Sequence, residues 1–229
     1  MTSAFVLGAT LTRTRLPSRG AFMAFVVALG VVVIVALLER RAGPLAAADR
    51  ALTGVVFGLT VPLLAYAAFE AALGGRRLDG AVRAIALQGG NRRSAVLGVC
   101  ATLGLVLAVS TMAIAAAALL AAYSPSDPRL LEDLGRTTWI AALGGLAYAA
   151  WFTLASTFGA AGGGRKWLLG LDWVLGASSG PLAVPWPRGH LRNLLGGTPV
   201  LDMHPGHAAL VLVVGMALAL AVAVYKLPE

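Results

Sequence analysis

The stretch GGRRLDGAVRAIALQGGNRR, residues 74–93, decides how this chain is organised. It contains five arginines and a single acid, Asp79. A long apolar run without charges precedes it at residues 51–69, and another follows it at residues 94–122. A basic segment enclosed by two such runs is typical of a loop that joins two membrane spans on the cytoplasmic side.

Within this basic segment, Leu78, Val82 and Ile85 recur at helical spacing. The spacing predicts a short helix over residues 78–88 with one apolar edge. A basic, amphipathic helix of this kind offers a docking surface to a soluble protein, and we expect Ile85 to contact that partner through the apolar edge. The pattern therefore predicts a membrane subunit that is controlled by a soluble partner.

The composition is that of a membrane protein. Of the 229 residues, 59% are hydrophobic and 12% are charged, about half the charged fraction of soluble domains. Sixteen of the eighteen basic residues are arginines, and they are grouped between apolar runs. Membrane topology explains such groups better than a nucleic-acid groove does, so we expect lipid contacts and no nucleic-acid partner. The lone Cys100 excludes a disulfide framework.

Several apolar runs approach the roughly 20 residues that a spanning helix needs. They predict an all-α, polytopic membrane protein of one domain with six spans, at approximately residues 20–38, 51–73, 94–122, 137–159, 167–184 and 207–225. Pro62 interrupts the second span and predicts a kink there. The fifth run is broken by Asp172 and Pro181, so we expect an irregular, re-entering region between the fifth and sixth spans.

The distribution of basic residues predicts the orientation in the membrane. With the amino terminus inside, eleven of the eighteen lysines and arginines fall on the inner side and seven on the outer side. The excess of positive charge favours a cytoplasmic location for both termini. An even number of spans agrees with this orientation, and we expect the chain in the inner membrane of a bacterium.

The chain lacks the motifs of catalysis. Residues 159–166, GAAGGGRK, come near a phosphate-binding loop, but Trp167 replaces the hydroxyl residue that would hold Mg²⁺. His204 and His207 are two candidate metal ligands, yet the intervening Pro205 breaks any helix that would align them. We therefore expect no enzyme activity, no metal and no cofactor in this chain.

Two acids in the apolar regions are candidate functional residues. Asp172 has two interpretations: an intramembrane proton site, or a structural ion pair with Arg165 and Lys166 near the cytoplasmic surface. We favour the ion pair. Glu70, near the inner end of the second span, is expected to pair with basic groups on a partner or on the amino-terminal segment.

This layout resembles the membrane subunits of type-two ABC exporters. The features that carry the resemblance follow one another along the chain: Phe69-Glu70, Arg76-Arg77, the helix 78–88, Asn91-Arg92-Arg93 and Gly98. Pro185-Trp186-Pro187 and residues 190–195 match the short helices that re-enter from outside. Residues 88–91, Gln-Gly-Gly-Asn, depart from the usual Thr/Ala-Pro-Val-Ser, which bears on subfamily and substrate.

The resemblance implies a permease that forms a dimer with a second permease copy. It also implies a separately encoded ABC ATPase that holds ATP and Mg²⁺ and pushes on a coupling helix, residues 78–88. The residues implied in coupling are Glu70, Arg76, Arg77, Leu78, Val82, Arg83, Ile85, Arg92 and Arg93. Lipid, peptide, antibiotic and haem substrates all stay open.

Two other functions stay open at this point. One is a membrane anchor or assembly subunit of a larger complex that transports nothing. The other is an ion-coupled transporter that uses Asp172 as its proton site.

Overall fold

The computed structural model describes residues 2–227, and its regular elements are helices. Among these residues, five helical stretches are long and apolar enough to cross a membrane: Arg19–Ala42, Pro44–Leu87, Arg92–Ala122, Leu130–Ala155 and Pro205–Tyr225. The all-α class is confirmed, and the architecture is that expected of a multi-pass membrane protein.

The first helix, α1 (Thr2–Arg15), packs on α6 (Arg92–Ala122). Two glycines permit the close approach. A Cβ atom on Gly8 would lie 2.1 Å from the carbonyl oxygen of Ala95, and one on Gly98 would lie 2.1 Å from that of Phe5. A turn then leads to α2 (Arg19–Glu39), whose first turn is capped by a hydrogen bond from the backbone N–H of Ala21 to the Ser18 hydroxyl (3.1 Å).

The second predicted span is irregular in an unexpected way. After the 3₁₀ turn Arg40–Ala42, helix α3 (Pro44–Asp49) runs into a π-helical stretch, η2 (Arg50–Thr60), and then into α4 (Val61–Leu73). The backbone N–H of Val61 bonds to Val56, five residues back. Pro62 follows at once and has no N–H to donate, so the α-helical ladder is interrupted at this point. Such wide turns are frequent at functional sites.

Helices α6 and α7 (Leu130–Ala155) form the centre of the bundle. A Cβ atom on Gly145 would lie 2.6 Å from the backbone nitrogen of Ala108, so α7 needs a glycine where it crosses α6. The Thr111 hydroxyl donates a hydrogen bond across the same contact to the carbonyl of Ala141 (2.7 Å). Small residues and a buried hydroxyl are the usual means of joining helices in lipid.

The fifth predicted span, residues 167–184, is not one helix. Helix α8 (Gly164–Leu175) has 12 residues, about 18 Å at 1.5 Å per residue, too short for a hydrocarbon core of about 30 Å. A 3₁₀ turn (Pro181–Ala183) and α9 (Pro187–Leu194) follow it. Six spanning helices are therefore not shown, because the irregular region starts inside the predicted fifth span.

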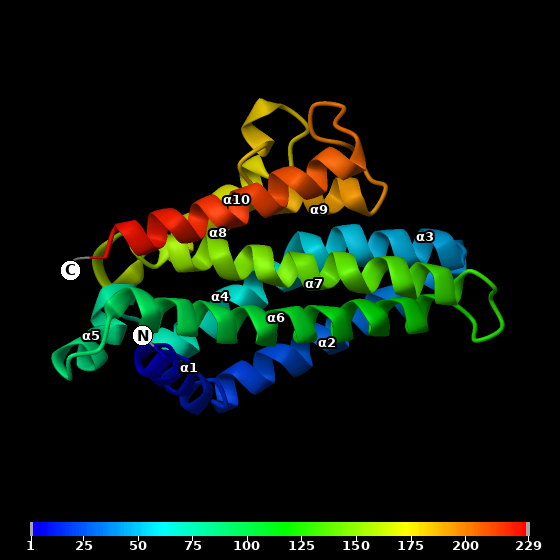
Figure 1. Cartoon of the computed structure of the whole chain (residues 1–229). Coiled ribbons are helices and arrows are strands. Elements are labelled where there is room, and N and C mark those ends of the chain that lie inside the picture. Colours follow the sequence, from blue (N-terminus) through cyan, green and yellow to red (C-terminus); the bar gives the residue numbers. More distant parts are fainter. Residues whose placement is uncertain (1, 228–229) are drawn as a thin grey trace.

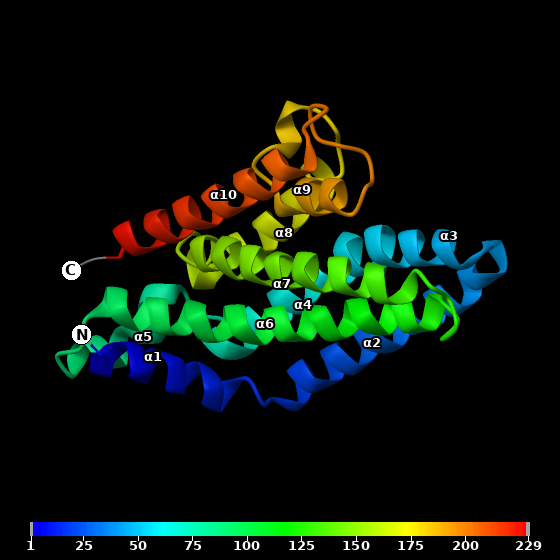
Figure 2. The same cartoon turned by 45° about the vertical axis from the view of Figure 1, so that its right-hand side comes forward.

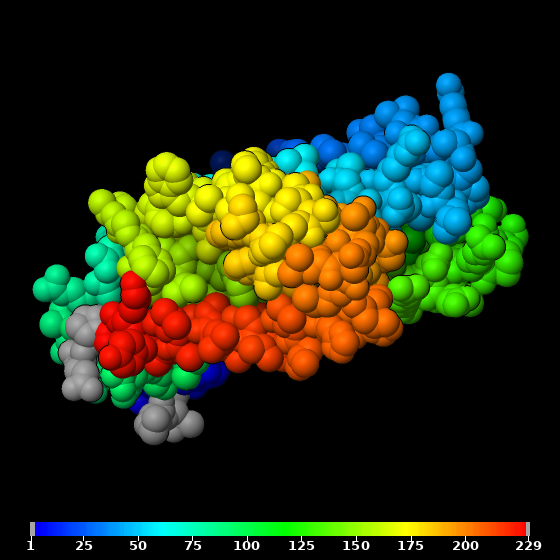
Figure 3. Space-filling model, turned by 90° about the horizontal axis from the view of Figure 1, so that it is seen from above, coloured from blue at the N-terminus to red at the C-terminus, as the bar shows by residue number. Residues whose placement is uncertain are grey.

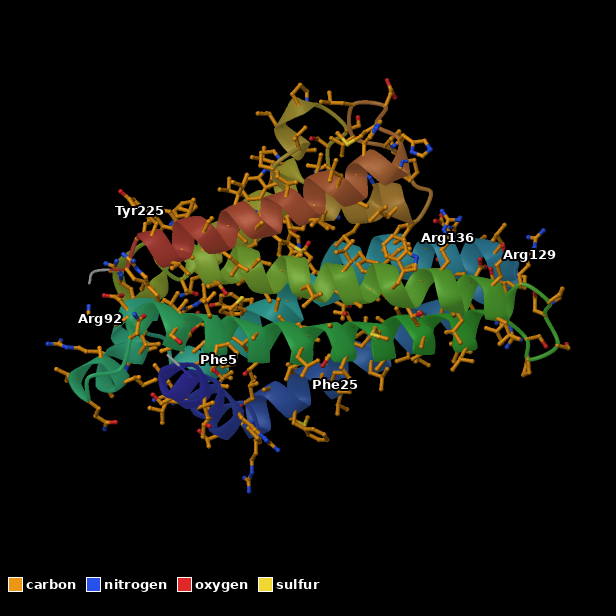
Figure 4. The ribbon with its side chains drawn as sticks, viewed as in Figure 1. Phe5, Phe25, Arg92, Arg129, Arg136 and Tyr225 are labelled. Atoms are coloured by element: carbon orange, nitrogen blue, oxygen red, sulfur yellow. The ribbon has the colours of Figure 1, made fainter. Side chains whose placement is uncertain are left out.

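The bundle has two distinct ends (Figures 1 and 2). Helix α1, helix α5 (Leu78–Leu87) of the basic loop and the last turn of α10 (Pro205–Tyr225) lie at one end, which we name the α5 end. Helix α3 and the loop between α6 and α7 lie at the other. Arg92 and Tyr225 mark the α5 end, and Arg129 and Arg136 lie toward the opposite end (Figure 4). This arrangement puts charged groups at both ends of the apolar helices.

Candidate functional site

The basic loop forms the predicted helix, α5, between Leu78 and Leu87. Its apolar edge points into the molecule: Leu78 and Val82 are fully buried, and Ile85 is 8% exposed. These side chains belong to an element that packs against α6 and α1. The edge thus holds α5 on the membrane helices, and the expectation that Ile85 presents its side chain to a partner does not agree with its burial.

The opposite side of α5 faces outward. It consists of four positions at helical spacing, Gly80, Arg83, Ala84 and Leu87, which we name the exposed face of α5. Leu87 is 76% exposed although it is a large apolar side chain. An exposed leucine beside an arginine, on a helix whose other side is fixed, is a suitable contact for a protein partner.

The other predicted basic residues flank this helix. Arg76 and Arg77 are exposed just before it, and Arg77 forms an ion pair with Asp79 (3.3 Å). Arg92 and Arg93 occupy the first turn of α6, where Arg92 is half-buried and Arg93 is exposed. The α5 end therefore carries a basic rim.

Arg165 is fully buried where the end of α4 meets the start of α8. Its Nε donates to Glu70 Oε1 (2.9 Å), and its Nη1 donates to the carbonyl of Arg76 (3.0 Å) and to the Ser156 hydroxyl (3.3 Å). Glu70 thus pairs with a basic residue of its own chain, not with the amino-terminal segment. The pair joins the end of α4 to the start of α8.

The glycine run before Arg165 makes room for this buried guanidinium. Gly159 and Gly162 adopt positive φ angles of 75° and 72°, which glycine adopts without strain. A Cβ atom on Gly162 would lie 2.5 Å from Arg165 Nη1. The sequence GAAGGGRK is therefore a turn that closes over an arginine side chain.

Further bonds fasten the loop before α5 to the end of α7. The backbone N–H of Leu78 bonds to the carbonyl of Ser156 (3.0 Å), and Arg77 Nη2 donates to the carbonyl of Thr157 (3.0 Å). The carboxyl-terminal end reaches the same place, since Lys226 Nζ lies 3.6 Å from the centre of the Phe158 ring. Helices α4, α5, α7, α8 and α10 are thereby joined at the α5 end.

Asp172 lies elsewhere, inside the bundle. It is fully buried, it accepts a hydrogen bond from the Tyr148 hydroxyl (2.7 Å), and it accepts another from the backbone N–H of Arg188 (3.3 Å). The favoured ion pair with Arg165 and Lys166 is therefore wrong, because Arg165 pairs with Glu70. Since Tyr148 stands seven residues before the end of α7, Asp172 is about 10 Å from that end.

His204 is the residue just before α10 and His207 lies in the first turn of that helix, and both are exposed. The ring of His204 accepts a hydrogen bond from the backbone N–H of Gly206 (3.1 Å) and so caps that helix. The two rings pack edge to face, 6.0 Å apart. Within residues 2–227, no three side chains of His, Cys, Asp or Glu gather into a group that could hold a metal ion.

No known protein-family model matches the chain, and none of the curated proteins matches it either.

Proposed function

We propose that this chain is the permease subunit of an ATP-driven exporter of the type-two ABC class. In this proposal two permease copies form the translocation pathway, and a separate ATPase docks on the exposed face of α5. The observation that carries the proposal is the double attachment of this helix. Its apolar edge is buried against α6 and α1, and the loop before it is bonded to the end of α7. Its outer face offers Arg83 and Leu87 to a partner.

Because it is attached on two sides, α5 can transmit a movement of the partner to the membrane helices. A push on the exposed face moves α5 together with α6, because separating the two helices would expose the buried side chains of Leu78 and Val82 and lose the free energy of their burial. The Arg165–Glu70 pair carries the displacement on to α8. Closure of a nucleotide-bound partner would then bias the bundle between two arrangements, to the extent that the partner binds one of them better.

The test is to purify the tagged, full-length chain in mild detergent from the cells that make it naturally. We expect an ATP-hydrolysing protein to co-purify. Arg83→Glu should reduce recovery of the ATPase about tenfold, because reversing the charge of a residue at the contact replaces attraction to an acidic partner surface by repulsion. Arg129→Glu, an exposed arginine at the other end, is the matched control and should leave recovery unchanged.

Two results would count against the exporter. If the wild-type chain brings down a larger assembly that contains no ATPase, the chain is an anchor or assembly subunit. If Arg83→Glu and Arg129→Glu recover the ATPase equally, α5 is not the docking element.

The buried Asp172–Tyr148 pair favours one alternative, an ion-coupled transporter, because the acid lies deeper than an interfacial ion pair. It does not line either of two cavities of about 510 and 620 Å³. We expect Asp172→Asn to lower stability while export stays ATP-driven and insensitive to the proton gradient. Loss of transport with normal assembly and ATPase binding would favour the proton-coupled mechanism instead.

A further inference from the structure

A groove of about 260 Å³ lies between α2, α4 and α6, beside the turn that joins α1 to α2. Leu16 and Pro17 of that turn line the groove, and so does Phe25, one helical turn further along α2 than Ala21. Helices α1 and α2 run along one flank of the bundle (Figures 1 and 2), and α10 runs along the opposite flank, the one that Figure 3 shows. Apart from Ser110, the lining residues are apolar. The volume is below the roughly 300–1,000 Å³ of sites for whole small molecules, so the groove suits part of a hydrocarbon chain.

Three arginines lie in and around the same turn: Arg13, Arg15 and Arg19. Arg13 and Arg19 are exposed, whereas Arg15 is half-buried and donates from Nη1 to the carbonyl of Ala72 (3.3 Å) at the end of α4. Residues 2–38 contain no acid, and the ion pairs found among the described residues do not involve these three arginines. The positive charge beside the groove is therefore not neutralised within the described part of the chain.

The length of α2 indicates the depth at which this charge lies. Its 21 residues span about 31 Å at 1.5 Å per residue, which matches a hydrocarbon core of about 30 Å. Arg19 is the first residue of α2, and Phe22, its neighbour one turn along the helix, is 66% exposed. An arginine beside an exposed phenylalanine suits the level where acyl chains meet headgroups, because each side chain then has the surroundings it prefers.

We propose that the turn between α1 and α2 binds an anionic phospholipid, with its headgroup at Arg13, Arg15 and Arg19 and part of one acyl chain in the groove. Guanidinium groups donate to phosphate oxygens in pairs, and each arginine near an anionic lipid strengthens binding about fivefold. Phosphatidylcholine also carries a phosphate, but its ammonium group brings a positive charge next to three arginines. This inference does not depend on the exporter proposal, since the site lies within one chain.

The test uses the purified, full-length chain in phosphatidylcholine nanodiscs that contain a small, non-saturating fraction of phosphatidylglycerol with a diazirine in its acyl chain. A parallel sample contains phosphatidylcholine with the same photoactivatable chain, and mass spectrometry maps the labelled peptides. We expect phosphatidylglycerol to label residues 16–25 and 64–68 about 25-fold more than phosphatidylcholine does, fivefold for each of the two exposed arginines. This preference should shrink in 1 M salt, because salt screens exposed charges. The comparison uses the wild-type protein, so it does not depend on the folding of any variant.

The double variant Arg13→Gln, Arg19→Gln should lose about 25-fold in labelling by phosphatidylglycerol and leave labelling by phosphatidylcholine unchanged. The matched control is Arg40→Gln, Arg41→Gln, which removes two exposed arginines just beyond the other end of α2 and should keep the preference. Equal labelling of the wild-type chain by the two lipids, or the same loss in both double variants, would overturn the proposal. So would the absence of labelling of residues 16–25 by either lipid, because a protein surface then covers the groove.

Discussion

Arg165 is a charged side chain with no exposure to solvent, so its partners determine whether the α5 end is stable. Glu70 supplies the opposite charge, and Ser156 and the carbonyl of Arg76 accept two further hydrogen bonds. A buried charge that loses its partner is costly, whereas an exposed one is not. We therefore expect changes at the buried Arg165 site and at the exposed Arg83 to have different effects on the free energy of unfolding, although both are single arginines in the sequence.

Glu70→Gln should lower the free energy of unfolding by about 3 kcal/mol, because Arg165 stays buried without its counter-charge. Arg83→Gln, on the exposed face of α5, should change it by less than about 0.5 kcal/mol. Denaturant titration of the purified chain in detergent measures both. If both variants lowered the free energy of unfolding by the same small amount, Arg165 would be in contact with water and not buried as described.

At the scale of elements, helix α1 depends on two glycines. Gly98→Ala places a methyl group 2.1 Å from the carbonyl oxygen of Phe5, so α1 must move away from α6. We expect a loss of about 1–3 kcal/mol, as for other overpacked sites. Gly30→Ala in α2, where no atom lies within 4 Å, is the control and should be neutral or slightly stabilising. Thermal unfolding of the two variants measures the difference. Equal melting temperatures for Gly98→Ala and Gly30→Ala would contradict the close contact between α1 and α6.

The elements that could be predicted from sequence are those with a strong local signal. The spacing of Leu78, Val82 and Ile85 predicted α5 to within a residue of its ends, and the long apolar runs predicted α2, α6 and α10 well. Local spacing shows that an edge is apolar but not what covers it, which is why Ile85 was assigned to a partner and proved to be buried.

Other features depend on contacts between distant residues. The Glu70–Arg165 pair joins residues 95 positions apart, and nearness in sequence to Asp172 suggested the wrong partner for Arg165. A signal was present in the glycine run 162–164, which allows the chain to turn tightly around a large side chain. The π-helical stretch before Pro62 likewise has no simple pattern, although the proline indicated that this span is irregular.

At the scale of the whole molecule, the start of α1, the end of α10 and α5 all lie at one end of the bundle. Reporter fusions test whether that end is cytoplasmic. A fusion after Gly90 should be active only as an inside reporter, and one after Ser126 only as an outside reporter, because this orientation puts eleven of the eighteen basic residues in the segments predicted to be cytoplasmic. The reverse pattern would place α5 outside the cell and exclude an ATPase as its partner.

In the proposed exporter, an ATPase contacts the exposed face of α5. A photo-crosslinking amino acid placed in turn at Ala84, Leu87 and Ile85, in cells that contain the natural partners, tests it most directly. We expect crosslinks from Ala84 and Leu87 to a nucleotide-binding ATPase, and from the buried Ile85 only within the chain. Crosslinks from the two exposed positions to lipid alone, or to a protein that hydrolyses no ATP, would contradict it.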